Sequence, residues 1–193
     1  MMAGLVIVIA TLAYSLFPTR FFFLNDDFIH IPMASDGTIG HHNGARHIND
    51  LSLYLDYLWT GNNAVGYHVT NALLHLFNVI LFGMLLQRIK LSLQINIPRN
   101  IMIAMLGLFA VYAIHAEPIF WVLCRTASLS LLLILLSWLF LFGTHKKWWL
   151  IFPAISCFVL ALFTYETSWL FPVFLIVWWW LAKNSMPNAK KYI

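Results

Sequence analysis

The sequence predicts an all-α membrane protein: a polytopic transmembrane helix bundle of about six spans, with one long outer loop carrying a short interfacial helix. Three observations predict it. Hydrophobic residues make up 62% of the 193 residues and charged residues only 9%, whereas a soluble domain carries about 25% charged residues. The mean hydropathy is +0.81. Apolar stretches recur along the chain, and the few charges fall mainly between them. We treat residues 1–193 as a single integral membrane domain.

Six apolar stretches are candidates for spanning helices, because a span needs about 20 apolar residues, with a range of about 17 to 25. They cover residues 3–17, 67–87, 99–115, 118–143, 148–165 and 167–182. Several are short, so we expect interfacial residues or neighbouring protein to complete their ends. The first stretch lacks the basic start and the small-residue cleavage site of a signal peptide, which predicts a retained helix.

The lysines and arginines predict the orientation of these helices. With the N-terminus in the cytoplasm, eight lie on the inner side and three on the outer side, as the positive-inside rule expects. The inner residues are Arg88, Lys90, Arg99, Lys146, Lys147, Lys183, Lys190 and Lys191, and the outer ones are Arg20, Arg46 and Arg125. The tryptophans at 148, 149 and 178–180 then form an inner aromatic belt. We expect a bacterial inner membrane or an ER-type membrane, both termini cytoplasmic, and a cytoplasmic tail at 183–193.

All the carboxylates can be placed on the outer side. They are Asp26, Asp27, Asp36, Asp50, Asp56, Glu117 and Glu166. Five of these seven lie in the long outer loop, residues 18–66. Loops of this length in compact domains are usually functional. Within the loop, residues 51–59 alternate loosely between apolar and polar, which we interpret as a short interfacial helix on the outer leaflet.

Two adjacent acids, Asp26 and Asp27, follow the first predicted span by a few residues. Neighbouring carboxylates repel each other, so one of them can keep its proton or bind a cation or a basic partner. A carboxylate at this surface can also act as a general base that takes a proton from an acceptor hydroxyl. The alternative is a solvated loop capped by acids, and the spacing leaves both open.

A polar face runs along the second predicted span. His68, Asn71, His75 and Asn78 follow each other in steps of three, four and three, which places them on one side of a helix. Polar groups in hydrocarbon need partners, so we expect this face to point into the bundle. It serves either hydrogen bonding between helices or, towards His68, a functional site.

A third polar group surrounds the second outer turn. Glu117 precedes Pro118, which suits the first turn of a helix, where a negative charge is also favoured. Arg125 then lies inside a predicted span, and an arginine there is a functional-site hypothesis because it is costly to bury. Its planar fork suits a lipid phosphate. The alternative is a structural ion pair with Glu117.

Other classes of function are disfavoured. The basic residues form no stripe, so we expect no nucleic acid as a partner. The spans show no inverted repeat, which disfavours a transporter. His41, His42 and His47 match no dedicated metal site, so we expect no cofactor, a divalent metal being the remaining option. Cys124 and Cys157 lie in apolar stretches and are expected to be buried free thiols.

Five segments, in order, resemble motifs of one family. They are residues 23–27 (Phe-Leu-Asn-Asp-Asp), Arg46 with 51–57, 66–75 (Gly-Tyr-His-Val-Thr-Asn-Ala-Leu-Leu-His), 113–121 with Arg125, and 165–167 (Tyr-Glu-Thr). The chain thereby resembles the GT-C superfamily of polytopic glycosyltransferases, and most closely the branch with protein O-mannosyltransferases and their tetratricopeptide-bearing relatives. Members usually carry more spans, so the resemblance implies a shortened relative.

The resemblance implies transfer of a sugar from a polyprenyl-phosphate donor at the outer, periplasmic or luminal, face. It makes Asp26 the first candidate for the catalytic base and Asp27 the second. The residues it suggests for substrate binding are Arg125, for the lipid phosphate, and Glu117, His115, His68, Arg46 and Glu166. The expected partners are membrane lipids, the lipid-linked sugar and further protein subunits. The alternative function is a non-catalytic GT-C-like scaffold subunit of a larger membrane complex.

Overall fold

The computed structural model describes residues 22–37, 46–112, 115–143 and 147–185, and every regular element within these ranges is helical. This confirms the all-α prediction for the described part of the chain. The elements are α2 (Asp27–Ser35), α3 (His47–Thr60), α4 (Ala64–Ser92), α5 (Arg99–Val111), α6 (Ala116–Phe120), α7 (Arg125–Gly143), η3 (Trp148–Leu150), α8 (Ile151–Leu162), η4 (Glu166–Leu170) and α9 (Phe171–Ser185).

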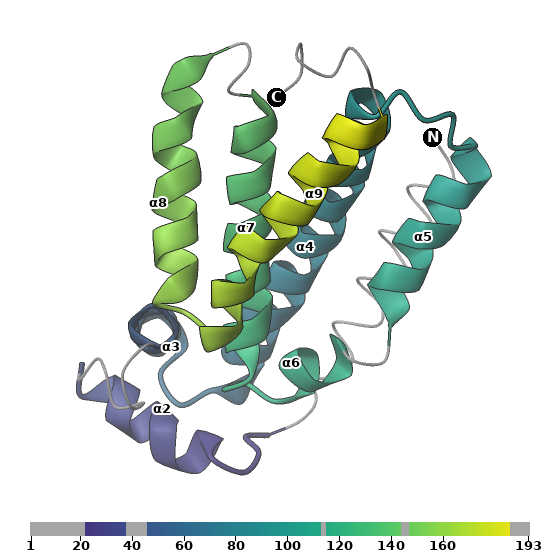
Figure 1. Cartoon of the computed structure of the whole chain (residues 1–193). Helices are drawn as coiled ribbons and strands as arrows, with labels where there is room; N and C mark the ends of the chain where they lie inside the picture. The colour runs from purple at the N-terminus through teal and green to yellow at the C-terminus, as the bar shows by residue number, and fades with distance from the viewer. Residues whose placement is uncertain (1–21, 38–45, 113–114, 144–146, 186–193) are drawn as a thin grey trace.

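Helices α4, α5, α7, α8 and α9 form a bundle, in which α7 packs against both α4 and α8 (Figure 1). Two of the described helices, α4 with 29 residues and α7 with 19, are long and apolar enough to cross a membrane. Helices α5, α8 and α9 contain 13, 12 and 15 residues. At 1.5 Å per residue α5 is about 20 Å long, less than the roughly 30 Å of a hydrocarbon core. Helices α4, α5, α7, α8 and α9 therefore occupy five of the six positions predicted for spans. The sixth, at 3–17, lies outside the described residues. Six full spans are not established.

The charges separate along the bundle as the sequence predicts. Helices α2, α3, α6 and the turn at η4 gather at one end (Figure 1), and all seven carboxylates lie on or beside these elements; we call it the acidic end. The opposite, basic end carries every described lysine and arginine except Arg46 and Arg125. These are Arg88, Lys90, Arg99, Lys147 and Lys183. Helices that follow one another in the sequence, α4, α5, α7, α8 and α9, alternate in direction, which brings the connecting segments of like charge together.

The predicted span at 118–143 is broken rather than continuous. Helix α6 ends at Phe120, residues 121–124 form a turn, and α7 begins at Arg125. The backbone N–H of Leu123 donates to the Asp27 carboxylate at 2.9 Å instead of to a helical carbonyl. This long-range bond satisfies the group that the break exposes, which explains why an apolar run does not stay helical here.

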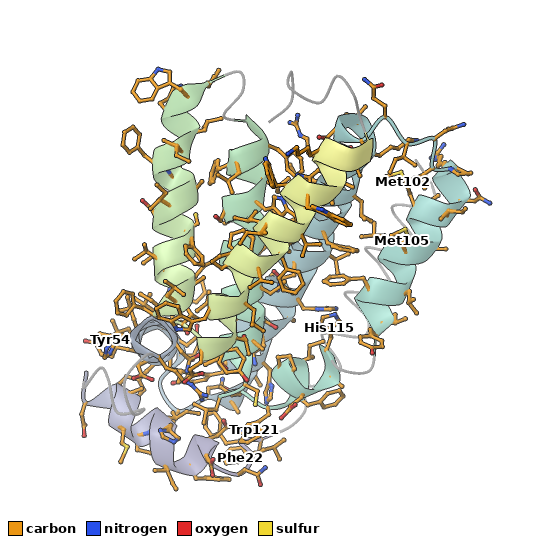
Figure 2. All side chains as sticks on the ribbon, in the orientation of Figure 1. Phe22, Tyr54, Met102, Met105, His115 and Trp121 are labelled. Atoms are coloured by element: carbon orange, nitrogen blue, oxygen red, sulfur yellow. The ribbon has the colours of Figure 1, made fainter. Side chains whose placement is uncertain are left out.

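The long outer loop is itself largely helical where it is described. Helix α2, which contains Pro32, was not predicted, and α3 begins at His47 and so is longer than the expected 51–59. Apolar side chains join both helices to α4 and to the turn after α6. The buried cluster contains Phe23, Ile31, Ala34, Leu53, Ala64, Tyr67, Val122 and Leu123. Trp121 packs against this cluster, and both Trp121 and Phe22 lie at the acidic end (Figure 2).

The turn between α3 and α4 depends on two glycines. Gly61 ends α3 with a φ of +57°, a conformation that glycine adopts without steric cost. Its carbonyl accepts a hydrogen bond from the Tyr67 hydroxyl at 3.0 Å. Gly66 lies so close to Thr60 that an added Cβ would be 2.2 Å from the threonine methyl group. The two helices can therefore meet at this angle only with glycine at 66.

Candidate functional site

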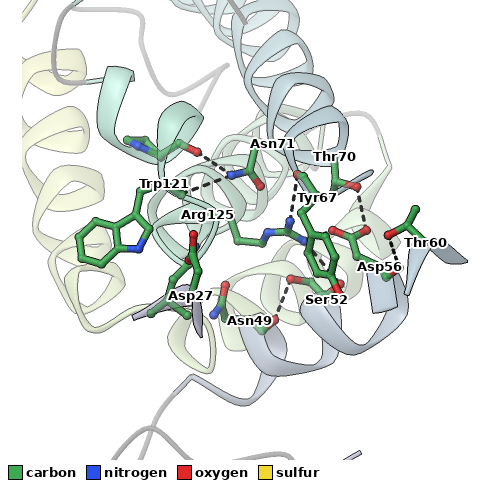
Figure 3. Close-up of polar contacts among 12 residues, drawn as sticks. Asp27, Asn49, Ser52, Asp56, Thr60, Tyr67, Thr70, Asn71, Trp121 and Arg125 are labelled. Atoms are coloured by element: carbon green, nitrogen blue, oxygen red, sulfur yellow. Dashed lines mark hydrogen bonds and ion pairs between the residues drawn. The ribbon is translucent and has the colours of Figure 1, made fainter. Parts of the chain in front are cut away.

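Arg125 is the centre of the polar contacts at the acidic end (Figure 3). Its side chain is fully buried, and one terminal nitrogen donates to the Asp56 carboxylate at 2.5 Å. The other terminal nitrogen donates to the backbone carbonyl of Tyr67 at 3.1 Å, and the guanidinium lies 5.7 Å from the centre of the Tyr67 ring. A buried arginine needs such a partner, because an uncompensated charge is strongly destabilising.

The carboxylate that neutralises Arg125 is thus Asp56, and the ion pair with Glu117 that was the structural alternative does not form. The second oxygen of Asp56 accepts a hydrogen bond from the Thr70 hydroxyl at 2.8 Å. Asp56 therefore joins α3 to both α4 and α7. In this arrangement Arg125 is buried and already paired, so it is not available at the surface to a lipid head group.

Asp27 is buried and fully engaged by the backbone. Its two oxygens accept hydrogen bonds from the N–H groups of Leu24 and Leu123, both at 2.9 Å. Burial raises the pKa of the Asp27 carboxyl, while its backbone hydrogen bonds act in the opposite direction. The turn after α6 is therefore held by the first residue of α2. Asp27 meets that turn as a structural clamp between α2 and the break at 121–124.

Asp26 differs from its neighbour in exposure. It is the residue before the first turn of α2, its side chain is exposed, and it makes no capping hydrogen bond. Asn25, which precedes it, has a positive φ of 46°, so the chain turns sharply as it enters α2. Of the two adjacent acids, only Asp26 is open to a substrate.

The polar face of α4 points into the protein, as predicted from its spacing. His68, Asn71, His75 and Asn78 are all buried, at 0–1% exposure. The side chains of Asn71, His75 and Asn78 each form a hydrogen bond to a different helix. Asn71 donates to the Pro118 carbonyl at 3.0 Å, His75 bonds to the Ala110 carbonyl at 2.9 Å, and Asn78 donates to the Ser128 carbonyl at 2.8 Å. These residues hold the bundle together by hydrogen bonds between helices.

His68 stands apart within this face. Neither ring nitrogen has a partner in hydrogen-bond geometry, although the Asp27 carboxylate and the backbone of Phe22 and Ile119 lie close to the ring. His68 is therefore enclosed next to Asp27, the carboxylate that joins α2 to the turn after α6, and is not accessible from outside.

His115 and Glu117 lie at the start of α6. The His115 ring is 5.3 Å from the His75 ring and 4.7 Å from the Phe109 ring, so it fills the corner between α5 and α6 (Figure 2). Glu117 is exposed and accepts a contact from the Cys124 thiol at 3.7 Å. Neither residue touches Arg125. Both cysteines are free thiols of intermediate burial.

A second ion pair lies nearer the surface. Arg46 contacts Glu166 through two nitrogens, with Nε 3.1 Å from Oε1 and Nη2 3.1 Å from Oε2. The side chains of Arg46 and Glu166 are 31% and 49% exposed, so solvent and ligands reach both. The guanidinium also lies 5.1 Å from the centre of the Tyr165 ring. Arg46 is thus the accessible arginine of the described acidic end.

An apolar cavity of about 410 Å³ begins beside this ion pair. Tyr165 and Thr167, the two neighbours of Glu166, line it, and the rest of its wall comes from α4, α5, α7, α9 and the end of η4. The residues that line it include Phe82, Phe109, Leu131, Trp138 and Phe174. A charged pair next to an apolar cavity suits an amphipathic ligand, with an anionic head and a hydrocarbon tail.

Within the described residues, no three His, Cys, Asp or Glu side chains lie together in a way that could hold a metal ion. His41 and His42 lie outside those residues, whereas His47 packs its ring 6.2 Å from that of Phe163. Comparisons with family models, with curated proteins and with solved structures found no match to this chain.

Asp56 is the main site residue to which sequence reasoning assigned no role. The sequence does contain a signal for Asp56, because Asn49, Leu53 and Asp56 follow in steps of four and three and so share one face of a helix. In the structure all three are buried. An asparagine and an aspartate on the inner face of an otherwise apolar helix indicate a buried polar partner. Identifying that partner as Arg125, 69 positions away, requires the fold.

Proposed function

We propose that this protein is a GT-C-type glycosyltransferase that transfers a sugar from a polyprenyl-phosphate donor at its acidic end. The observation that carries the proposal is the convergence of the segments in which the resemblance lies. The described parts of these segments are 23–27, Arg46 with 51–57, 66–75, 115–121 with Arg125, and 165–167, and they are far apart in the sequence but meet at one end of the bundle. Such convergence is expected if they build one site.

The proposal includes a multi-pass arrangement in the membrane, with the acidic end outside and both termini cytoplasmic. The separation of acidic and basic ends supports it, because lysine and arginine favour the cytoplasmic side. The acceptor would then approach from the periplasm or the lumen, and the donor from the outer leaflet.

Asp26 is the proposed base. It accepts the proton of an acceptor hydroxyl while the hydroxyl oxygen forms a bond to the anomeric carbon of the sugar. The bond between that carbon and the lipid phosphate oxygen breaks, and its electron pair leaves with the phosphate. Asp27 was the second candidate, but its oxygens are engaged by Leu24 and Leu123. We therefore assign Asp27 to holding α2 in place.

Arg46 is the proposed partner of the donor phosphate. Its planar fork is exposed and lies beside the apolar cavity, which suits the first part of a polyprenyl tail. Arg125, the first choice from sequence, supports the site from within through Asp56. A phosphate at Arg46 has to compete with Glu166, whose carboxylate accepts hydrogen bonds from the Arg46 guanidinium.

The donor site is tested by measuring binding of a polyprenyl phosphate to the purified protein and two variants. Arg46→Gln should weaken binding about tenfold or more, because a hydrogen bond to a charged group contributes roughly 1.5–3 kcal/mol. Glu166→Gln should strengthen it, because the competing charge is removed. Asp36→Asn, an exposed acid at the end of α2, is the control and should have no effect. Unchanged binding by Arg46→Gln would place the head group elsewhere.

The second candidate function is a non-catalytic scaffold subunit. Two observations favour it: α5, α8 and α9 are short for spans, and Asp27, Asp56 and Arg125 are all used in structural contacts. Neighbouring subunits could cover the ends of short helices. A stoichiometric membrane partner in the purified complex, together with no sugar transfer by that complex, would support this function over the first.

A further inference from the structure

The basic end of the bundle has no acidic side chain to balance its charge. All seven carboxylates lie at the acidic end, where the ion pairs of Arg46 with Glu166 and of Arg125 with Asp56 are also found. Helix α7, which runs from one end to the other, contains 19 residues and is about 28 Å long. Ion pairs form at distances up to about 4 Å, so no side-chain carboxylate can pair with a described cation of the basic end.

The helix ends do not balance this charge either. A helix carries about half a negative charge at its C-terminus and about half a positive charge at its N-terminus. Among the described helices, α4, α7 and α9 end at the basic end, whereas α5 and α8 begin there, so their partial charges largely cancel (Figure 1). Lys90 donates to the Ile97 carbonyl at 2.7 Å. The other described cations of this end are exposed, namely Arg88, Arg99, Lys147 and Lys183. They need anions from outside the chain.

Two of these exposed cations are held over tryptophan rings. Nζ of Lys147 lies 5.9 Å from the centre of the Trp149 ring, and Nζ of Lys183 lies 5.2 Å from that of Trp179. The two tryptophans are 50% and 47% exposed, and tryptophan favours the level of the lipid head groups. A cation–π contact positions the ammonium group, but the ring has no net charge with which to neutralise it. Both lysines therefore present a full positive charge.

Both lysines also extend from the corner where α7 and α9 meet. The Phe142 ring lies 5.5 Å from the Trp178 ring, which joins the last turn of α7 to α9. The Lys147 N–H donates to the Gly143 carbonyl at 3.1 Å, so Lys147 stays next to the end of α7. Lys183 follows Trp178 by five positions, about 7.5 Å further along α9. One corner of the basic end thus carries two ammonium groups.

An exposed apolar stripe lies below this corner. Ile176 and Val173 follow Trp179 along α9 in steps of three, towards the acidic end, and are 64% and 55% exposed. A ligand that covers both the lysines and this stripe needs an anionic group joined to hydrocarbon. An acidic soluble protein supplies the charge but leaves the apolar stripe uncovered.

We infer that the basic end binds anionic phospholipids of the surrounding leaflet, with their head-group phosphates at Lys147 and Lys183 and their acyl chains along α9. A zwitterionic lipid is a poorer match, because its own cation already balances its phosphate. The inference rests on α4 and α7 crossing the bilayer. It is independent of sugar transfer and of the donor site at Arg46, which lies at the opposite end.

Energy transfer from the tryptophans of the full chain to a dansyl-labelled lipid, in nanodiscs of phosphatidylcholine, tests the inference. Labelled phosphatidylglycerol should accumulate beside the protein relative to labelled phosphatidylcholine. Replacing both lysines, as Lys147→Gln with Lys183→Gln, should lower this preference about fivefold or more, which is roughly the contribution of one cation near an anionic surface. The matched control is Arg88→Gln with Arg99→Gln, which removes the same charge from the same end but leaves both lysine–tryptophan contacts in place. Its effect should be smaller.

Three results would overturn the inference. Equal transfer to the two labelled lipids by the wild-type chain would show that no anionic lipid is preferred, and would favour an acidic soluble partner. Equal losses in the lysine and arginine variants would remove the two lysines as the site. Loss of the preference in Arg46→Gln, with the lysine variant unchanged, would place the anionic lipid at the donor site instead. All four substituted positions of the basic end are exposed, so the melting temperatures of both variants should match that of the wild type.

Discussion

At the scale of single residues, Asp56 and Arg125 decide how the acidic end is assembled. The pair connects α3 to α7, and Arg125 has no exposed surface through which water could replace its partner. Removing one member of a buried pair costs about 3–5 kcal/mol, whereas an exposed pair contributes about 0–1 kcal/mol. The two ion pairs of this end should therefore respond very differently to substitution.

We predict that Asp56→Asn lowers the free energy of unfolding by several kcal/mol, because it leaves the Arg125 charge buried without its partner. The matched substitution at the surface pair, Glu166→Gln, should change it by about 1 kcal/mol or less. Thermal unfolding of both variants in detergent provides the comparison. Equal, small losses would show that Arg125 finds another anion.

Of this pair, only Arg125 could be identified from the sequence. Sequence reasoning identified Arg125 as a buried cation because an arginine in an apolar run is visible locally. It offered Glu117 as a candidate partner because helical spacing brings the two together, but the break at residues 121–124 removes that register. The true partner lies on a different helix, and no local pattern encodes that pairing.

At the scale of elements, regular spacing predicted well where a helix is continuous. The steps between His68, Asn71, His75 and Asn78 placed all four on the buried face of α4. The break before α7 and the presence of α2 were missed for one reason. Both depend on Asp27, whose carboxylate accepts hydrogen bonds from the N–H groups of Leu24 and Leu123.

The packing of α3 against the start of α4 gives a prediction at this scale. Gly66→Ala should destabilise the protein by about 1–3 kcal/mol, because the new methyl group collides with Thr60 and forces the helices apart. Gly107→Ala in α5 is the control, since nothing lies within 4 Å of its Cβ position. That change should be neutral or stabilise by about 0.4–1 kcal/mol. Melting temperatures that order the two variants the other way would contradict the packing.

At the scale of the whole molecule, the main feature is the separation of charge between two ends. The sequence predicted it from the positions of the charged residues alone, and the described helices place those residues accordingly (Figure 1). The number of full spans could not be predicted as well. Composition measures how apolar a segment is, whereas the length of its helix depends on turns such as the one at Tyr112, where α5 has already ended.

A labelling experiment tests which of the two ends faces the cytoplasm. In intact cells, with Cys124 and Cys157 replaced, a membrane-impermeant maleimide should label Asn62→Cys at the acidic end directly. Lys147→Cys at the basic end should react only after the membrane is permeabilised, because positive charge stays on the cytoplasmic side. Labelling of Lys147→Cys but not Asn62→Cys in intact cells would invert the arrangement.

The most direct test of the proposed function is transfer of a labelled sugar from a polyprenyl-phosphate donor by the full chain, purified with its native partners. The adjacent acids Asp26 and Asp27 are replaced one at a time, and the transfer rate and melting temperature of the two variants are compared. Asp26→Asn should lower the transfer rate about 10²- to 10⁴-fold, the usual contribution of a general base, with the melting temperature unchanged. Asp27→Asn should instead lower the melting temperature, because an amide cannot accept from both N–H groups with its two end atoms. Wild-type transfer rates in a folded Asp26→Asn variant would contradict the account, as would no transfer by the wild-type chain in its native complex.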